Sequence, residues 1–194
     1  MHTKKSLAGS RYNASMSLQR HDLQSYHWCQ IGLHWLVALL VAVQYTTGSS
    51  IDRTHNAIAR GLNPESFDLT LHVIHNRTGL VILGLILIRL AMRLLIGAPN
   101  PAVPDPDWQF RLARATHLGF YLILIVEAST GAIASYFFWP VSVVHVALSK
   151  LLLALIILHT FAALWHFSIK RDGTLERMVP LNMLRNWRLR RRKA

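Results

Sequence analysis

The chain has 194 residues, of which 52% are hydrophobic and only 15% are charged, and its formal net charge is +12. Soluble domains carry about 25% charged residues, so this balance excludes an ordinary soluble domain and favours a small membrane protein. The mean hydropathy of +0.29 and the isoelectric point near 10.9 indicate that basic and apolar residues are segregated along the chain. We therefore attribute the positive charge to membrane orientation and expect no nucleic-acid partner.

The N-terminal residues 1–26 are polar and basic, and we expect them to form a cytoplasmic tail. They lack the apolar run of a signal peptide, so the first hydrophobic segment is expected to remain in the protein as an anchor. The chain has a single cysteine, Cys29, which excludes a disulfide framework. It also excludes the Cys-x-x-Cys-His motif of covalently attached haem.

Four apolar segments follow, each close to the roughly 20 residues that a helix needs to cross a bilayer. They cover approximately residues 31–50, 72–96, 116–138 and 145–168. Four prolines between the second and third segments predict a loop over 97–114. We therefore predict an all-α fold, a four-helix transmembrane bundle over residues 27–170, followed by a basic cytoplasmic tail over 171–194.

The distribution of Lys and Arg predicts the orientation of the bundle, because cytoplasmic loops carry an excess of both. With the N-terminus inside, 17 of these residues lie on the inner side and 4 on the outer side. Both termini are therefore expected in the cytoplasm, and in a bacterium the bundle would lie in the inner membrane. The basic cluster at 185–194 is expected to lie on anionic lipid.

The fourth apolar segment carries His145 and His159, fourteen residues apart. On an α-helix this spacing is about 21 Å along the axis, and fourteen steps of about 100° return nearly to the same face. Ionisable side chains within a membrane span usually face the bundle interior. Two imidazoles on one inner face, near opposite leaflets, indicate two stacked haems, each with a second axial ligand from another helix.

Depth in the membrane selects the second ligands. His34 lies near the inner end of its segment, as His159 does, so we predict that these two hold the iron of the inner haem. His75 and His145 both lie near outer ends, so we predict that they hold the iron of the outer haem.

Two other histidines compete for these roles. His72 lies one helical turn before His75, but Gly79 follows His75 and leaves space for a flat macrocycle, which favours His75. His166 lies near the line of His159, but at the cytoplasmic interface, where its haem would be half in water.

A set of four stretches carries most of these features. They are, in chain order, "QIGLHWLVALLV", "VIHNRTGLVILGLILIRLAMR", "THLGFYLILIVEASTG" and "LHTFAALWHFSIKRDGTLERMVP". Together they resemble the bacterial cytochrome b561 family, over roughly residues 26–180. The resemblance implies a four-helix, di-haem b protein of the inner membrane, and its axial ligands fall on the four histidines chosen by depth. It also implies electron transfer between a soluble or membrane donor and the ubiquinone pool, and one family member is similar to a superoxide oxidase.

Cationic residues flank both predicted haems. Arg77 and Lys150 lie near the outer ligands, where they would hold haem propionates or else extend to the interface as ordinary snorkelling cations. Arg89 and Arg93 lie four residues apart near the inner end of the second segment. They would contact inner propionates or a quinone carbonyl, or else serve only as positive-inside anchors.

Three further titratable residues lie within the last two segments. His117 and His166, near the inner ends, are candidates to bind or protonate a quinone, because histidine titrates near neutral pH. Glu127 is near the middle of the third segment, where it would be either a proton donor or a neutral acid bonded to a backbone carbonyl.

Two functions fit these features. One is a self-contained oxidoreductase that passes electrons from superoxide or another small reductant to ubiquinone through two haems b. The other is a haem b anchor and electron-transfer subunit for a separate dehydrogenase or a periplasmic redox protein; haem storage or sensing is a third reading. The short connection at 138–142 favours the anchor, because it leaves the outer haem open to a protein partner, whereas the compact length favours the oxidoreductase.

Overall fold

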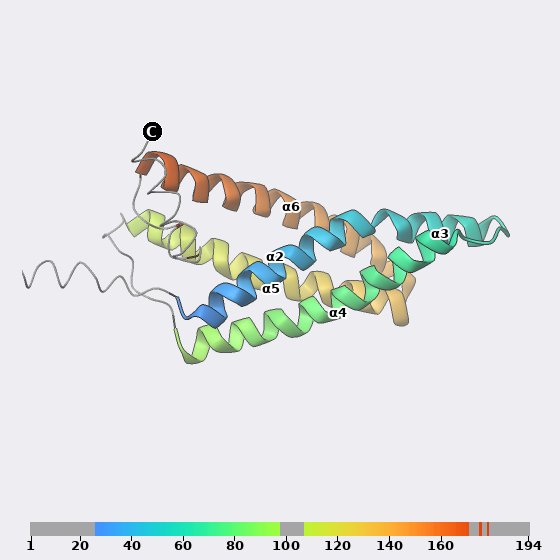
Figure 1. The fold of residues 1–194 in the computed structure, drawn as a ribbon, viewed down its shortest axis with the longest axis horizontal. Coiled ribbons are helices and arrows are strands. Elements are labelled where there is room, and N and C mark those ends of the chain that lie inside the picture. The colour runs from blue at the N-terminus through green and yellow to red at the C-terminus, as the bar shows by residue number, and fades with distance from the viewer. Residues whose placement is uncertain (1–25, 98–106, 171–174, 176–177, 179–194) are drawn as a thin grey trace, which may run out of the picture.

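The computed structural model describes residues 26–97 and 107–170, together with residues 175 and 178. The described chain is helical almost throughout (Figure 1). Its helices are α2 (Trp28–Thr47), α3 (Ser49–Ala59), α4 (Ser66–Leu95), α5 (Asp107–Tyr136) and α6 (Ser142–Trp165), with a short 3₁₀ turn η1 (Trp139–Val141) and a closing π-helical turn η2 (His166–Lys170). Most of the predicted tails 1–26 and 171–194 lies outside the described residues.

Four spans in the described chain are long and apolar enough to cross a membrane. They are Trp28–Ala59, Ser66–Leu95, Trp108–Tyr136 and Trp139–Lys170. The predicted all-α, four-helix transmembrane bundle is therefore confirmed, while the two haems in its core stay a prediction.

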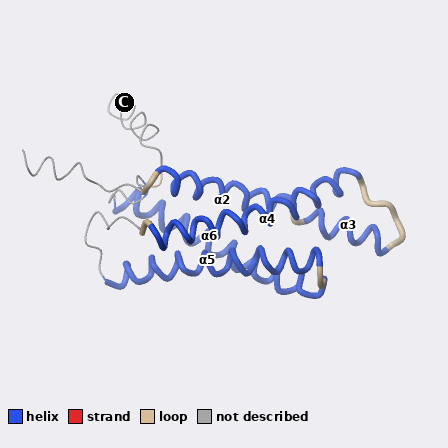
Figure 2. Tube along the Cα trace, turned by 90° about the horizontal axis from the view of Figure 1, so that it is seen from below, coloured by secondary structure: helices blue, strands red, loops and turns tan. Residues whose placement is uncertain are grey.

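The helices pack in chain order around the bundle. α2 lies along α4, α4 along α5, and α5 along α6, and Figure 2 shows these rods running nearly parallel. On the fourth side, the Tyr45 hydroxyl of α2 donates a hydrogen bond to the Ser149 carbonyl of α6 at 2.6 Å. This arrangement lets side chains from α2, α4 and α5 all face α6 across the bundle interior.

A small apolar core fills the middle of the bundle. Its buried members in the described chain are Val37, Val41, Ile82, Ile86, Leu124 and Leu152. Many other large apolar side chains are exposed, such as Leu158 on α6 and Leu87 on α4, as expected for helices that face lipid. On α6 the core residue Leu152 lies midway between His145 and His159, so the core separates the two ends of the bundle.

At the end with the α3–α4 connection, the helices are longer than their apolar segments. The first span was predicted to end near residue 50 but continues as α3 to Ala59, because Gly48 keeps helical backbone angles (φ −55°, ψ −39°). α4 begins at Ser66 rather than near 72, and its Asp68 accepts two hydrogen bonds from Arg53 of α3, at 2.9 and 2.7 Å. Hydropathy reports contact with lipid rather than helicity, so polar helical turns escaped the prediction.

The extra turns make one end of the bundle uneven, the end that the sequence predicts to be the outer one. α3 and the first turns of α4 extend beyond the ends of α5 and α6 (Figures 1 and 2). The connection between α5 and α6 is short, as predicted, and consists of η1 with its flanking residues. The predicted loop over 97–114 is also shorter than expected, since α5 begins at Asp107.

Candidate haem sites

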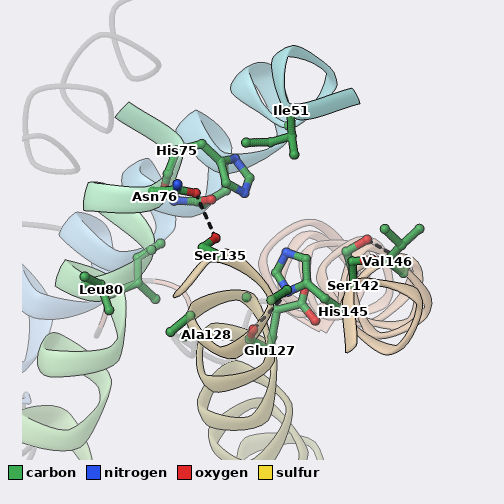
Figure 3. A pocket seen from close by; sticks show the side chains of 18 of the residues that line it. Ile51, His75, Asn76, Leu80, Glu127, Ala128, Ser135, Ser142, His145 and Val146 are labelled. Carbon is green, nitrogen blue, oxygen red and sulfur yellow. Dashed lines mark hydrogen bonds and ion pairs between the residues drawn. The ribbon is translucent and has the colours of Figure 1, made fainter. Parts of the chain in front are cut away.

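The outer predicted ligands face one another. His75 of α4 and His145 of α6 have ring centroids 6.3 Å apart, and both point into the same space in Figure 3. An imidazole nitrogen binds a transition metal at about 2 Å, so two rings on opposite sides of one metal have centroids roughly 6 Å apart. The separation of the two rings therefore fits one iron between them, and their role as its ligands stays a prediction.

Hydrogen bonds orient both rings. The Nδ1 atom of His145 lies 2.9 Å from the carbonyl oxygen of Glu127 and donates to it. The Nδ1 atom of His75 lies 3.1 Å from the Thr47 hydroxyl oxygen, whose own proton goes to the Val43 carbonyl at 2.7 Å. Because each Nδ1 then carries the proton, each Nε2 presents a lone pair to a metal.

A cavity of about 270 Å³ adjoins these rings and is lined from α2, α3, α4, α5, η1 and α6. Gly131 of α5 touches His145 so closely that an added Cβ would lie 2.9 Å from its Cε1 and 3.2 Å from its Nδ1. Gly79 lines the cavity as well, although a Cβ there would make only an ordinary 3.6 Å contact with Gln44. The mostly small and apolar lining, the two oriented imidazoles and their separation fit a haem held between two histidines.

The competing histidine at this end points elsewhere. The His72 ring lies 5.5 Å from that of His55 on α3, and His55 stacks on Trp139 of η1 at 4.1 Å. This geometry favours His75 over His72 as the outer ligand. Arg77 and Lys150 are exposed and do not line the cavity, so their contact with outer propionates stays a prediction.

The inner predicted ligands are also paired. His34 of α2 and His159 of α6 have ring centroids 6.4 Å apart, again the separation that one iron between them requires. A third imidazole, that of His117 on α5, lies 6.3 Å from His159, and the Phe120 ring meets His159 edge-on at 5.2 Å. The pair His34–His159 stays a prediction, and His117 adjoins it more closely than the sequence suggested.

A second, small cavity of about 30 Å³ lies at the inner end of the bundle. Its lining residues are Tyr26, Gln30, Arg89, Arg93, His117, Tyr121 and Met178. Three residues that the sequence nominated for a quinone, Arg89, Arg93 and His117, are therefore gathered there. His166, at the start of η2, is not among them.

Sequence reasoning missed residues at both sites. Gln30 is buried near the inner end, where its backbone carbonyl accepts a hydrogen bond from Arg89 Nη1 at 2.7 Å. Its signal was a polar side chain one helical turn before His34. Gly131 and Thr47 carried no such signal, because their roles depend on which helices lie opposite them.

Comparison with known proteins identifies the family of the chain. A family model described as prokaryotic cytochrome b561 matches residues 25–181. The chain belongs to the prokaryotic cytochrome b561 family. This membership makes it a multi-pass membrane b-type cytochrome that binds haem b and acts in electron transfer.

Individual relatives resemble the chain over most of its length. Cytochrome b562 of Cereibacter sphaeroides is 28% identical and covers 79% of this chain and 94% of its own. The probable superoxide oxidase CybB of Yersinia pestis is 31% identical, over 81% of this chain and 97% of its own. Cytochrome b561 homolog 1 of Escherichia coli is 27% identical, over 78% of this chain and 94% of its own. The chain therefore matches nearly the whole of each relative.

Proposed function

We propose that this cytochrome holds two haems b and transfers electrons between a small outer reductant, with superoxide as the first candidate, and the ubiquinone pool. The observation that carries the proposal is the pair of facing imidazoles at each end of the core, His75–His145 and His34–His159, with centroids 6.3 and 6.4 Å apart. A relative named as a probable superoxide oxidase supports the choice of reductant. Haem iron supplies one-electron redox chemistry when it is bound.

At the outer end the chain supplies ligands, orientation and a mostly apolar enclosure. His75 and His145 would coordinate through Nε2, while Thr47 and the Glu127 carbonyl hold the Nδ1 protons. An anionic reductant such as superoxide is attracted by exposed cations, and Arg77 together with Lys150 would supply that field or bind propionates.

At the inner end the chain supplies hydrogen-bond donors for a quinone. Arg89, Arg93 and His117 line one small cavity next to the inner pair, and reduced quinone oxygens accept charge-assisted bonds from such groups. Reduction of ubiquinone also consumes protons, so titratable groups beside cytoplasmic water are needed. His166 is proposed to belong to the same proton supply.

The membrane arrangement follows the positive-inside rule. We place the bundle in the bacterial inner membrane with both termini in the cytoplasm, because 17 of the 21 Lys and Arg residues then lie inside. The tails 1–26 and 171–194 would lie on that side, with the basic C-terminal tail on anionic lipid.

One observation favours the alternative of a haem b anchor for a periplasmic redox protein. The α3–α4 projection carries exposed apolar side chains, with Ile58, Leu62 and Phe67 between 59% and 66% exposed. A partner that seats there would cover these side chains and reach the outer end of the bundle (Figure 1).

The deciding experiment uses the purified holoprotein. A pyridine haemochrome assay should give two b-type haems per chain, and a superoxide generator should then reduce them rapidly and pass electrons to added ubiquinone. One haem per chain would contradict the two-site arrangement. Haem reduction that appears only after a partner protein is added would favour the anchor instead.

A further inference from the structure

A further pair of histidines from different helices lies outside both predicted haem sites. The rings of His55 on α3 and His72 on α4 have centroids 5.5 Å apart and planes inclined at 31°. His55 is exposed and His72 is half-buried, so an ion from the surrounding water can reach them. Neither residue lines the outer cavity, although Trp139, on which His55 stacks, does. The pair therefore adjoins the outer site without belonging to it.

The separation of these rings differs from that of the predicted haem pairs. A nitrogen ligand lies about 2.0–2.1 Å from zinc, and zinc sites are tetrahedral, so two imidazoles on one zinc meet at a bent angle with centroids roughly 5 Å apart. Two rings on opposite sides of an iron lie farther apart, and the predicted haem pairs are separated by 6.3 and 6.4 Å. The 5.5 Å between His55 and His72 is nearer to the bent arrangement.

Packing and an ion pair hold the helices together next to these imidazoles. α3 packs along α4, and the α3 residues Ser50 and Thr54 are buried, with 0% and 2% of their surfaces exposed. Arg53 Nη2 of α3 lies 2.7 Å from Asp68 Oδ1 of α4, one helical turn before the α4 histidine. Because the helices are already fastened here, an ion that binds both rings needs little rearrangement of the backbone.

The ring nitrogens are suited to a transition metal. His55 stacks on Trp139 with centroids 4.1 Å apart and planes inclined at 21°. Stacking uses the faces of the ring, whereas the nitrogen lone pair lies in the ring plane and stays free for a metal. Imidazole suits zinc, copper and nickel, whereas magnesium and calcium prefer oxygen ligands. Within the described ranges no group of three or more His, Cys, Asp or Glu residues converges, so water would complete the coordination.

We propose that His55 and His72 form a binding site for one divalent transition-metal ion, with zinc as the probe ion. The ion would fasten α3 to α4 at the end of the bundle that carries the outer cavity. It would also stabilise that end, because it binds the folded arrangement of the two helices. The site does not depend on the haems, since neither histidine is a predicted ligand of haem iron.

The test is isothermal titration calorimetry of the purified holoprotein with Zn²⁺, without a histidine tag and after treatment with a chelator. His55→Ala and His72→Ala each remove one ligand, and the double variant removes both. His27→Ala is the matched control, because His27 is also exposed but lies at the start of α2, at the other end of the bundle. Haem content, measured in each variant, verifies that the bundle is intact.

The wild-type protein should bind one Zn²⁺ per chain that is sensitive to both substitutions. Loss of a residue that merely supports a metal ligand already lowers metal affinity about 10–100-fold, so each single variant should bind at least about tenfold more weakly. The double variant should lose little more than either single variant, because the two residues act as one site. His27→Ala should bind Zn²⁺ as the wild-type protein does.

Copper tests the ligands without any substitution. Cu²⁺ also binds imidazole, and its electron paramagnetic resonance signal is separate from that of low-spin haem. The wild-type spectrum should show coupling to two imidazole nitrogens, and either single variant should reduce the coupling to one nitrogen. This measurement keeps the inference testable even where a variant does not fold.

Zn²⁺ binding of equal strength in the wild-type protein and both variants would overturn the inference, as would the absence of binding or an equal loss in His27→Ala. Loss in only one of the two variants would also overturn it, because a single imidazole rather than a shared ion would then explain the binding. A copper spectrum of the wild-type protein without two imidazole nitrogens would have the same consequence.

Discussion

The outer and inner ends of the bundle hold their imidazole pairs at the same separation, 6.3 and 6.4 Å, yet they surround them differently. The outer pair adjoins a cavity of about 270 Å³, with the Glu127 carboxyl group against one ring. The inner pair has a third imidazole beside it, and the adjoining cavity of about 30 Å³ is lined by two arginines.

This contrast shows how one ligand geometry can serve two tasks. A bound iron would need this ligand separation at both ends, whereas the neighbouring groups would set how tightly each site holds an electron and which ligand can approach. The proposed quinone would meet two arginines at the inner end, whereas the outer end offers the larger cavity.

The largest expected effect separates the two ends completely. His75→Ala or His145→Ala should remove the outer haem and keep the inner one, because each leaves one side of the iron without a ligand. His159→Ala should do the reverse. Haem content by pyridine haemochrome should fall from two to one per chain in each case.

His34→Ala tests whether the third imidazole at the inner end, that of His117, can act as a haem ligand. The predicted result is loss of the inner haem, since His34 is the assigned ligand. Retention in His34→Ala, followed by loss in the His34→Ala, His117→Ala double variant, would show that His117 can take its place at 6.3 Å from His159. His166→Ala should keep both haems.

The close contact between Gly131 and the His145 ring tests the outer end alone. Gly131→Ala places a Cβ 2.9 Å from His145 Cε1, so the ring must move and outer haem affinity should fall about ten- to a hundredfold. Gly32→Ala is the control, because an added Cβ there meets nothing within 4 Å. Haem transfer to an apo-acceptor protein measures the affinity; equal loss in both variants would refute a local clash.

The inner end should respond in quinone exchange rather than in haem content. Neutral replacements of Arg89, Arg93 and His117 remove charge-assisted hydrogen bonds worth roughly 1.5–3 kcal/mol. Electron exchange with a soluble ubiquinone analogue should slow about tenfold or more, since ~1.4 kcal/mol is a factor of ten. Stopped-flow haem oxidation measures the rate, and His166→Gln shows whether the site extends to η2. Unchanged rates in all four would move the quinone site elsewhere.

The smallest expected effect concerns the His75 ring at the outer end. Thr47→Val removes the acceptor of the His75 Nδ1 proton, which should cost about 1 kcal/mol in outer haem binding. Thr46→Val is the control, because the Thr46 hydroxyl also bonds the Val43 carbonyl but Thr46 is exposed. Near-infrared spectra of the ferric outer haem should change only in the first variant.

The sequence by itself determined the four spans, and it predicted the orientation of the bundle and the helical face that two imidazoles share. Hydrophobic length reports membrane crossing directly, and helical periodicity places His145 and His159 on one face about 21 Å apart. The sequence also predicted His34 and His75 as ligands from their depth in the membrane, since depth follows from position along a single helix.

Only the tertiary structure decided which side chains meet. These contacts depend on the distances and rotations between helices. Examples are the contacts of His72 with His55, of His117 with His159 and of Gly131 with His145. Periodicity within one helix carries no information about them. The same holds for the length of α3, because polar helical turns beyond the apolar segment are stabilised by contacts such as Arg53–Asp68 at 2.7 Å rather than by lipid.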